Sequence, residues 1–210
     1  MENYMNEEIN ERVREIKRSF RMMMNGVVAQ SMRDKGVEYH VNWGASLPML
    51  KEKAREIGKD YDLAIALWKD DVRECKILAT LVMPADRMLP EVVDIWMEQT
   101  VSQEIAELAS FNLYQYLPYA ADKAYQWIAS ERTVCLICGF SVLSRLFMNG
   151  QEPNERGINE YLDQLLTALQ GDSMAVKKAA MASVVRFADL GLVYRRMAES
   201  ALKSINLELF

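Results

Sequence analysis

Hydrophobic positions between residues 67 and 82, "LWKDDVRECKILATLV", recur with the spacing of one helical face. Steps of four, three, four and three residues separate Trp68, Val72, Cys75, Ala79 and Val82. Four further apolar residues, Leu67, Ile77, Leu78 and Leu81, widen this stripe, which is typical of a helix covered on more than one side. Asp71 followed by Glu74 has the form of a capping box at a helix start. The pattern therefore predicts a short helix that ends near Trp68 and a longer one that begins near Asp71.

Start and stop signals divide almost the whole remaining chain into helices of ordinary length. Thr100 with Gln103 forms a second capping-box pattern, and Pro90 opens a helix at its first position. The further helices are expected at about residues 6–24, 26–35, 46–58, 90–99, 100–117, 119–129, 131–148, 157–170, 172–190 and from 191 to the C-terminus. Residues 37–46 form an irregular stretch that includes His40, and no β-hairpin signal is present.

Helix pairs in this scheme recur every 35 to 40 residues, the length at which two-helix solenoid repeats are built. The spacing favours an all-α solenoid, and a compact helical bundle is the alternative. With 210 residues the chain is long enough for one sizeable core or one array of repeats. We therefore expect a single domain over residues 1–210.

Charge is distributed unevenly along a chain whose formal net charge is −5. Residues 61–130 hold five basic and eleven acidic side chains, whereas residues 176–210 hold six basic and three acidic ones. An acidic average weakens nonspecific binding to nucleic acids but leaves room for a local basic stripe. The ends are therefore more favourable for a polyanion than the middle.

Apolar segments and cysteines limit the remaining classes of function. The stretch 133–144 is bracketed by Arg132 and Arg145, so it is too short for a membrane span and reads as a buried helix. The charged N-terminus lacks the features of a secretory signal, which predicts a cytoplasmic protein. Cys135 and Cys138 form a C-x-x-C, but without a second pair or a nearby histidine core packing is favoured over metal or redox chemistry. Neither ligand clusters nor a glycine-rich phosphate loop occurs, so no metal and no organic cofactor is expected.

The order of features from Gly44 to Val82 resembles the N-terminal half of the AlkD-like DNA alkylation-repair proteins. The matching elements are Gly44, Pro48, Leu67-Trp68, Arg73-Glu74 and Ala79. Downstream, "YQWIASERTVCLICGFSVLSRL" and "AVKKAAMASVVRFADLG" follow in the family's order. The resemblance covers about residues 44–190.

This resemblance implies a right-handed α-α superhelix of HEAT-like repeats whose concave basic face holds duplex DNA. Family enzymes are monofunctional glycosylases that excise cationic N-alkylated purines without drawing the base into a deep pocket. A carboxylate near the deoxyribose stabilises the developing positive charge, two tryptophans pack on the sugar and backbone, and an arginine holds phosphate.

The chain departs from the family pattern at these positions. The family's Trp-x-x-x-Asp falls on Gln103-x-x-x-Glu107, so Glu107 is the candidate catalytic carboxylate, with a solvated pair formed by Glu104 and Glu107 as the alternative. The arginine position reads Leu136 and Ile137, and Arg132 lies one helical turn earlier. The second tryptophan falls on Ala182 or Ser183.

Further candidates follow from the same comparison. The expected contacts to the DNA backbone are Arg132, Lys177, Lys178 and Arg186, with plain solubility as the alternative for the last three. Trp127 is a candidate for the aromatic groove or, alternatively, a buried anchor between repeats. Five cations near the N-terminus, Arg12, Arg14, Lys17, Arg18 and Arg21, indicate a solvated face with intrahelical ion pairs, or a DNA clamp.

Two functions remain at this point. The first is an alkylation-repair protein that binds duplex DNA, with or without excision of N-alkylated purines. The second is a catalytically inactive HEAT-repeat scaffold that binds a protein partner or undamaged DNA. The sequence predicts no oligomeric state.

Overall fold

The computed structural model describes residues 2–35, 37 and 39–208. Contacts divide the chain into two compact units, unit 1 (Met1–Leu108) and unit 2 (Ala109–Phe210), and the boundary falls within helix α7. The expectation of one domain over residues 1–210 stays a prediction.

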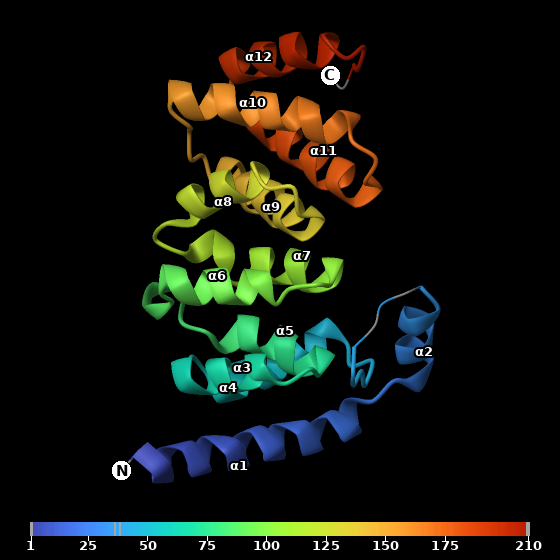
Figure 1. The fold of residues 1–210 in the computed structure, drawn as a ribbon, viewed down its shortest axis with the longest axis vertical. Coiled ribbons are helices and arrows are strands. Elements are labelled where there is room, and N and C mark those ends of the chain that lie inside the picture. Colours follow the sequence, from blue (N-terminus) through green and yellow to red (C-terminus); the bar gives the residue numbers. More distant parts are fainter. Residues whose placement is uncertain (1, 36, 38, 209–210) are drawn as a thin grey trace. The chain divides into compact units, whose positions relative to one another are not determined.

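Unit 1 is built from helices joined by short turns (Figure 1). Its elements are α1 (Glu2–Phe20), η1 (Arg21–Met23), α2 (Gly26–Asp34), α3 (Leu47–Ile57), α4 (Tyr61–Lys69), α5 (Arg73–Val82), η2 (Ala85–Arg87), α6 (Pro90–Glu98) and the first part of α7 (Gln103–Asn112). Within the described residues, β structure is limited to one isolated bridge between Val41 and Val72.

The core of unit 1 lies where α1, α4, α5 and α6 meet. The indole rings of Trp68 and Trp96 stack with centroids 4.1 Å apart and planes 2° from parallel. Helix α1 packs on α4 through its buried residues Val13, Ile16 and Phe20, which recur at helical spacing. These apolar contacts define the side of α1 that is not available to solvent.

Ion pairs hold α1 to both ends of α4. Arg12 Nη1 lies 2.8 Å from Asp60, and Lys17 Nζ lies 3.2 Å from Asp70. Asp60 is also the N-cap of α4, because its side chain accepts the Leu63 N–H. The intrahelical pairs expected on α1 are formed by Arg14 and Arg18 with Glu11, whereas Arg12 and Lys17 reach across to α4.

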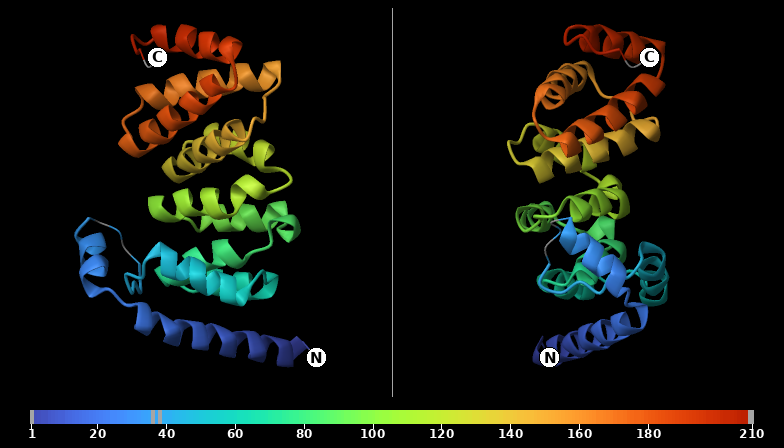
Figure 2. Two further views of the ribbon diagram at one scale, coloured as in Figure 1. Left: turned by 180° about the vertical axis from the view of Figure 1, so that it is seen from behind. Right: turned by 90° about the vertical axis from the view of Figure 1, so that its right-hand side faces the viewer.

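Unit 2 is a stack of longer helices (Figure 2). It contains the end of α7, η3 (Tyr114–Tyr116), α8 (Ala120–Ile128), α9 (Thr133–Met148), α10 (Glu155–Gln170), α11 (Met174–Asp189) and α12 (Leu192–Lys203). Helix α9 packs against α8 and α11, and α11 packs against α10 and α12.

Aromatic rings form the core of unit 2. Four buried rings, Phe140, Phe147, Tyr161 and Phe187, contact one another with centroids 5.0 to 6.4 Å apart. The Tyr161 hydroxyl is buried and lies 2.7 Å from Ser183 Oγ, so its polar atom is satisfied. Helices α8 and α9 approach closely at Gly139, where a Cβ would lie 2.7 Å from the Ile128 side chain.

The predicted all-α content is confirmed, and the helices lie close to their predicted positions. Both C-x-x-C cysteines are buried on α9 and are not joined in a disulfide, as the core-packing interpretation predicts. Residues 37–46 include the exposed loop residue His40, while Gly36 and Glu38 lie outside the described residues. Among the described helices, none combines the length and apolar character that crossing a membrane requires.

Both predicted capping boxes are wrong. Helix α5 begins at Arg73, with Val72 as N-cap and no side-chain cap, and Glu74 instead accepts the N–H groups of Trp43 and Ala45. The Thr100 hydroxyl donates to the carbonyl of Trp96, at the end of the preceding helix. In each case the polar side chain satisfies a neighbouring segment rather than the first turn of its own helix.

Candidate nucleic-acid interface

Helices α9 and α11 lie side by side in unit 2 and carry most of the predicted DNA contacts. At their junction the side chains are small: Ser144 Oγ donates to the Ala182 carbonyl at 3.4 Å. Ser144 is half-buried and Ala182 is exposed, so the backbone of α11 is accessible at this point. Small residues allow a ligand to approach the backbone closely.

Two of the predicted contacts lie on one exposed face of α11. Lys178 and Arg186 are exposed and separated by eight residues, with exposed Ala182 midway between them. This spacing places Lys178 and Arg186 about 12 Å apart along the helix. Arg186 Nη1 lies 3.2 Å from Asp189, an exposed pair of the kind that contributes little and is easily exchanged for another anion. Lys177 precedes Lys178 and is half-buried.

Arg145 bounds the apolar stretch on α9 and was not among the contacts predicted from the sequence. Its guanidinium carbon lies 4.6 Å from the centroid of the Phe111 ring, and its Nη1 donates to Met148 Sδ. Phe111 is 38 % exposed, so the stacked pair reaches the surface. Stacking on an aromatic face restrains an arginine while leaving other N–H groups available, which suits phosphate binding. In the sequence, the only feature that could have indicated Arg145 as a contact was its position as a basic residue in the last turn of α9.

The two remaining candidates of unit 2, Arg132 and Trp127, differ in solvent exposure. Arg132 is the exposed N-cap residue of α9, and its backbone N–H donates to Ser130 Oγ at 3.2 Å. Trp127 is only 5 % exposed, and its ring centroid lies 5.2 Å from that of Tyr114. This burial favours the interpretation of Trp127 as an anchor between helices over the groove interpretation.

Charges of opposite sign are segregated in unit 2. It holds ten basic and ten acidic residues and is therefore neutral. Acidic residues gather on α10, where Glu155, Glu160 and Asp163 share a shallow surface pocket with Arg156. Helices α11 and α12 together carry six basic residues and two acidic ones. The basic stripe expected from the sequence is therefore local to these helices.

The predicted catalytic carboxylate, Glu107, lies on α7 and is exposed. Its Oε1 accepts a hydrogen bond from Gln103 Nε2 at 2.8 Å, so the residue at the family's tryptophan position contacts the carboxylate through an amide. At the second tryptophan position, Ala182 is exposed, while Ser183 is fully buried. Neither position supplies an aromatic wall.

The alternative expectation of two solvated carboxylates agrees with the exposed Glu107 but is wrong for Glu104. Its carboxylate accepts from Arg73 Nε at 2.8 Å and Nη2 at 2.6 Å, and the Tyr39 hydroxyl donates to it at 3.1 Å. Its side chain is 27 % exposed. Two parallel N–H···O bonds make this a bidentate pair, which is the strongest arrangement of arginine and carboxylate.

Arg73 and Glu74 extend this contact into a buried network. Arg73 is 4 % exposed and donates to both the Ala45 carbonyl and Glu74 at 3.0 Å. Burial lowers the pKa of Arg73, but Glu104 and Glu74 outweigh it and raise the pKa overall. Burial also raises the pKa of Tyr39 well above its usual value. The network joins residues 39–45 to the start of α5 and α7, which is a structural role.

A small cavity of about 260 Å³ lies beside this network and contains Lys76. Lys76 Nζ donates to the Trp68 carbonyl and lies 4.6 Å from the centroid of the Trp68 ring. Burial lowers the pKa of Lys76, while the nearby carboxylate of Asp71 opposes the effect. Because the ammonium satisfies the end of α4, Lys76 acts as a helix cap. In the described part of the chain, no group of three or more metal-ligating side chains occurs.

Comparison with solved structures supports the fold. A chain described as belonging to a new family of proteins related to the HEAT-like repeat DNA glycosylases, with affinity for branched DNA structures, is similar with a TM-score of 0.80 and 16% sequence identity. The alignment covers 91% of this chain and 82% of that one. The predicted fold class, an α-α superhelix of HEAT-like repeats, is thereby confirmed.

Sequence comparison identifies the family. No curated protein matches the chain. The family model for the DNA alkylation repair enzyme matches residues 16–136. The match begins before residue 44, where the resemblance noted in the sequence begins, and it ends within α9. This match spans more than half of the chain, so the protein belongs to the DNA alkylation repair enzyme family.

Proposed function

We propose that the protein binds DNA through the surface formed by α9 and α11 of unit 2. The contacts to the DNA backbone are Arg132, Arg145, Lys177, Lys178 and Arg186. The observation that carries the proposal is the exposed face of α11, where Lys178 and Arg186 flank the small Ala182. Family membership and the affinity for branched DNA described for the similar structure support it.

The chemistry of this surface suits phosphate rather than bases. Lysine and arginine side chains that neutralise phosphates release condensed counterions, so affinity falls steeply as salt rises. Contacts to phosphate position a protein on the duplex but carry no sequence information. We therefore propose duplex DNA as the ligand, either continuous or as the arms of a branched structure.

Arg145 adds a restrained contact to this set. Its guanidinium lies over Phe111, and this stacking limits the side-chain entropy that phosphate binding would cost. The half-exposed Phe111 ring also offers an apolar surface to deoxyribose. Arg145 thus offers a guanidinium on α9, the helix that carries Leu136 and Ile137, where the family pattern expects an arginine.

Binding is tested by fluorescence anisotropy with a labelled duplex and a labelled four-way junction across a salt series. The double variant Lys178→Ala/Arg186→Ala removes two phosphate contacts, so the slope of log K against log salt falls by about two. The matched control is Arg156→Ala, which removes an exposed arginine of the same unit from the acidic surface of α10. The control leaves slope and affinity unchanged.

Two outcomes would overturn the proposed surface. An unchanged slope in the double variant would remove α11 from the interface, and an equal loss in Arg156→Ala would show only an effect of net charge. Absence of any salt-dependent DNA binding would leave the scaffold function. The ratio of junction to duplex affinity decides between branched and continuous DNA.

Excision of N-alkylated purines is the second candidate function, with Glu107 as the charge-stabilising residue. The exposed Glu107 carboxylate, held by Gln103, favours it. In this reaction the bond between C1′ and the purine nitrogen breaks, the electron pair neutralises the cationic base, and water adds to C1′ with loss of a proton. A fixed anion lowers the free energy of the cationic sugar that forms.

Release of purine from methylated DNA tests this second function. If Glu107 acts as proposed, Glu107→Gln lowers the rate of release at least about 100-fold, comparable to removing one stabilising group of an active site. Gln103→Ala serves as a control for the carboxylate's position. Release that is unchanged in Glu107→Gln would remove this residue from the mechanism, and no release from the wild-type chain would leave DNA binding alone.

A further inference from the structure

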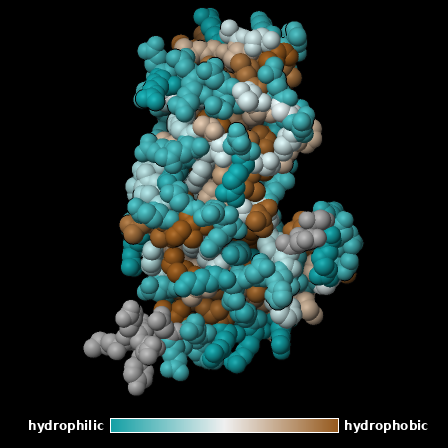
Figure 3. Space-filling view, viewed as in Figure 1, coloured by the Kyte–Doolittle hydropathy of each residue, from teal (hydrophilic) through white to brown (hydrophobic). Residues whose placement is uncertain are grey.

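Unit 1 has an apolar groove that its own helices leave open. The groove has a volume of about 630 Å³ and lies between α1, α4 and α6. Its apolar lining includes Val13, Ile65, Ala66, Val92, Ile95 and Trp96. Ile95 is 51 % exposed, and Figure 3 shows hydrophobic side chains gathered over α4 and α6 on this face. Exposed apolar patches of this kind mark interaction sites.

The groove fits the side chains of a helix better than a small molecule. Small-molecule sites present several convergent polar groups, whereas two of the polar side chains of this lining, Gln99 and Asp70, are engaged internally. Gln99 Oε1 accepts the Trp68 indole N–H at 2.8 Å, and Asp70 pairs with Lys17. A helix that lies in such a groove inserts apolar residues at helical spacing.

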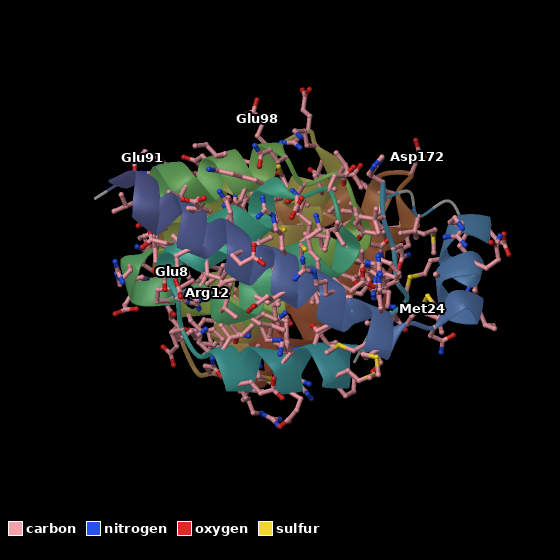
Figure 4. The ribbon with its side chains drawn as sticks, turned by 90° about the horizontal axis from the view of Figure 1, so that it is seen from below. Glu8, Arg12, Met24, Glu91, Glu98 and Asp172 are labelled. Carbon is pink, nitrogen blue, oxygen red and sulfur yellow. The ribbon has the colours of Figure 1, made fainter. Side chains whose placement is uncertain are left out.

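Acidic residues follow the α6 edge of the groove. Glu91 and Glu98 stand on either side of Ile95 in the helical sequence, and "PEVVDIWME" contains no basic residue. Both side chains are exposed, and Figure 4 shows them on α6, while Glu8 and Arg12 lie on the other side of α1. Asp62 on α4 is a further exposed acid in the lining. The lining also includes the exposed Lys69 at the end of α4, so it is the α6 edge with its acidic residues that favours an apolar segment with positive charges beside it.

Such a segment exists at the end of unit 2. Helix α12 leaves Leu192 64 %, Val193 62 % and Met197 38 % exposed. Arg196 and Lys203 are exposed on the same side of the helix, opposite the buried Ala198 and Leu202.

We propose that the outer face of α12 in one molecule docks in the α1–α4–α6 groove of a second copy. Leu192, Val193 and Met197 contact the apolar floor, and Arg196 and Lys203 approach the acidic α6 edge. The lengths are compatible, since α12 has 12 residues and the groove walls α4 and α6 have nine each. Because the two surfaces differ, the association is heterologous and adds copies head to tail.

Light scattering or sedimentation of the full chain without DNA tests this association. The wild-type mass rises above 24.1 kDa as concentration increases over roughly 1 μM to 1 mM, the range of weak to moderate dissociation constants. Added salt lowers the mass because exposed charge pairs are screened. A wild-type mass that stays at the monomer value over this range would overturn the proposal.

Two variants with exposed substitution sites identify the surfaces. Ile95→Lys places a cation in the groove, and Val193→Glu places an anion on α12. Each weakens association about tenfold or more, since like charges are brought together at the interface. Val101→Lys, at a position 82 % exposed, is the matched control and associates like the wild type.

Mixing the two variants gives the decisive result. Ile95→Lys retains an intact α12 and Val193→Glu retains an intact groove, and the introduced lysine and glutamate carry opposite charges, so the mixture regains association that neither variant shows alone. Failure of the mixture to associate, or unaltered association of either variant alone, would overturn the pairing. Both variants keep the wild-type affinity for DNA at the α9–α11 surface, so this proposal and the DNA proposal fail separately.

Discussion

Unit 1 and unit 2 solve the problem of packing short helices by different means. Unit 1 has 15 basic and 20 acidic residues, and its irregular segment 39–45 is attached through buried ions. Unit 2 has equal numbers of basic and acidic residues and joins its helices through a cluster of aromatic rings. Helices that pack directly on one another need only apolar contacts, whereas a loop brings backbone donors and acceptors that polar side chains must satisfy.

The two cores also differ in how much they constrain the surface. In unit 2 the aromatic cluster forms the core, while Lys178 and Arg186 of α11 are exposed and Arg186 pairs with Asp189. In unit 1, by contrast, Arg12, Lys17 and Arg73 all hold segments together. Three cations of unit 1 thus serve the fold, whereas the core of unit 2 rests on aromatic rings, and four variants test this difference.

The largest effect is expected from Phe187→Ala. Phe187 is fully buried and contacts Phe147, Tyr161 and Tyr194, so truncation leaves a cavity and lowers the free energy of unfolding by about 3–5 kcal/mol. Chemical denaturation measures the change, and hydrogen exchange localises it to unit 2. The control Phe111→Ala, on an exposed ring, costs much less; equal losses would show that the cluster is not the core.

Arg73→Met removes the cation of the buried network in unit 1. It leaves Glu74 buried without its cation, and the two backbone N–H donors compensate only in part. Removing one partner of a buried ion pair costs about 3 kcal/mol or more. Thermal unfolding measures this loss, with faster exchange of amides in residues 39–45. Arg14→Met, which removes an exposed pair, costs at most about 1 kcal/mol.

Gly44→Ala tests how residues 39–45 meet α2. Gly44 has φ of +68°, and a Cβ there would lie 2.2 Å from the Asn25 carbonyl oxygen and 2.9 Å from the Ala29 nitrogen. Backbone strain together with this clash lowers stability by roughly 1–3 kcal/mol. Gly26→Ala is the control, because nothing lies within 4 Å of its Cβ position. Similar melting temperatures for both variants would contradict the prediction.

The smallest change in the free energy of unfolding is expected from Asp60→Asn, and this change depends on pH. Burial raises the pKa of Asp60, but the Leu63 N–H and Arg12 outweigh it and hold the pKa below its usual value. A carboxyl with a lowered folded pKa stabilises the fold above its unfolded pKa of about 3.9, and this contribution is lost as pH falls through the folded value. Asparagine keeps the N-cap but loses the ion pair, which costs at most about 1 kcal/mol at neutral pH.

The comparison that isolates this carboxyl is the pH dependence of unfolding. The difference in stability between wild type and Asp60→Asn shrinks as pH falls below about 4, because the wild-type carboxyl becomes neutral. Asp62→Asn, at an exposed site in the same helix, is the control. A difference that is constant from neutral to acidic pH would exclude the ion pair as its cause.

Helix positions could be predicted from the sequence because they depend on local spacing. The apolar period placed α4, α5 and α9 correctly, and Pro90 marked the start of α6. The ends of helices were less predictable where a side chain serves another segment. Glu74 and Thr100 have the spacing of caps, yet Glu74 binds residues 43–45 and Thr100 binds the end of α6.

Candidate site residues were harder to predict for the same reason. Glu104 and Glu107 share a sequence context, but only the fold brings Arg73 and Tyr39 to Glu104 and leaves Glu107 exposed. Arg145 became a candidate contact only because its guanidinium lies over the ring of Phe111, which is 34 positions earlier in the chain. Trp127 could be an anchor or a groove residue until its burial was known. Contacts between distant segments carry this information, and a single sequence does not contain their geometry.

The parallel indoles of Trp68 and Trp96 have an optical consequence. At 4.1 Å and 2° their electronic transitions are close enough to couple, so the ultraviolet spectrum of the folded protein is expected to differ from that of two isolated indoles. Trp96 also lines the groove between α1, α4 and α6. Binding of a partner in this groove is therefore expected to change the absorption or fluorescence of the stacked indoles, which can be measured without an added label.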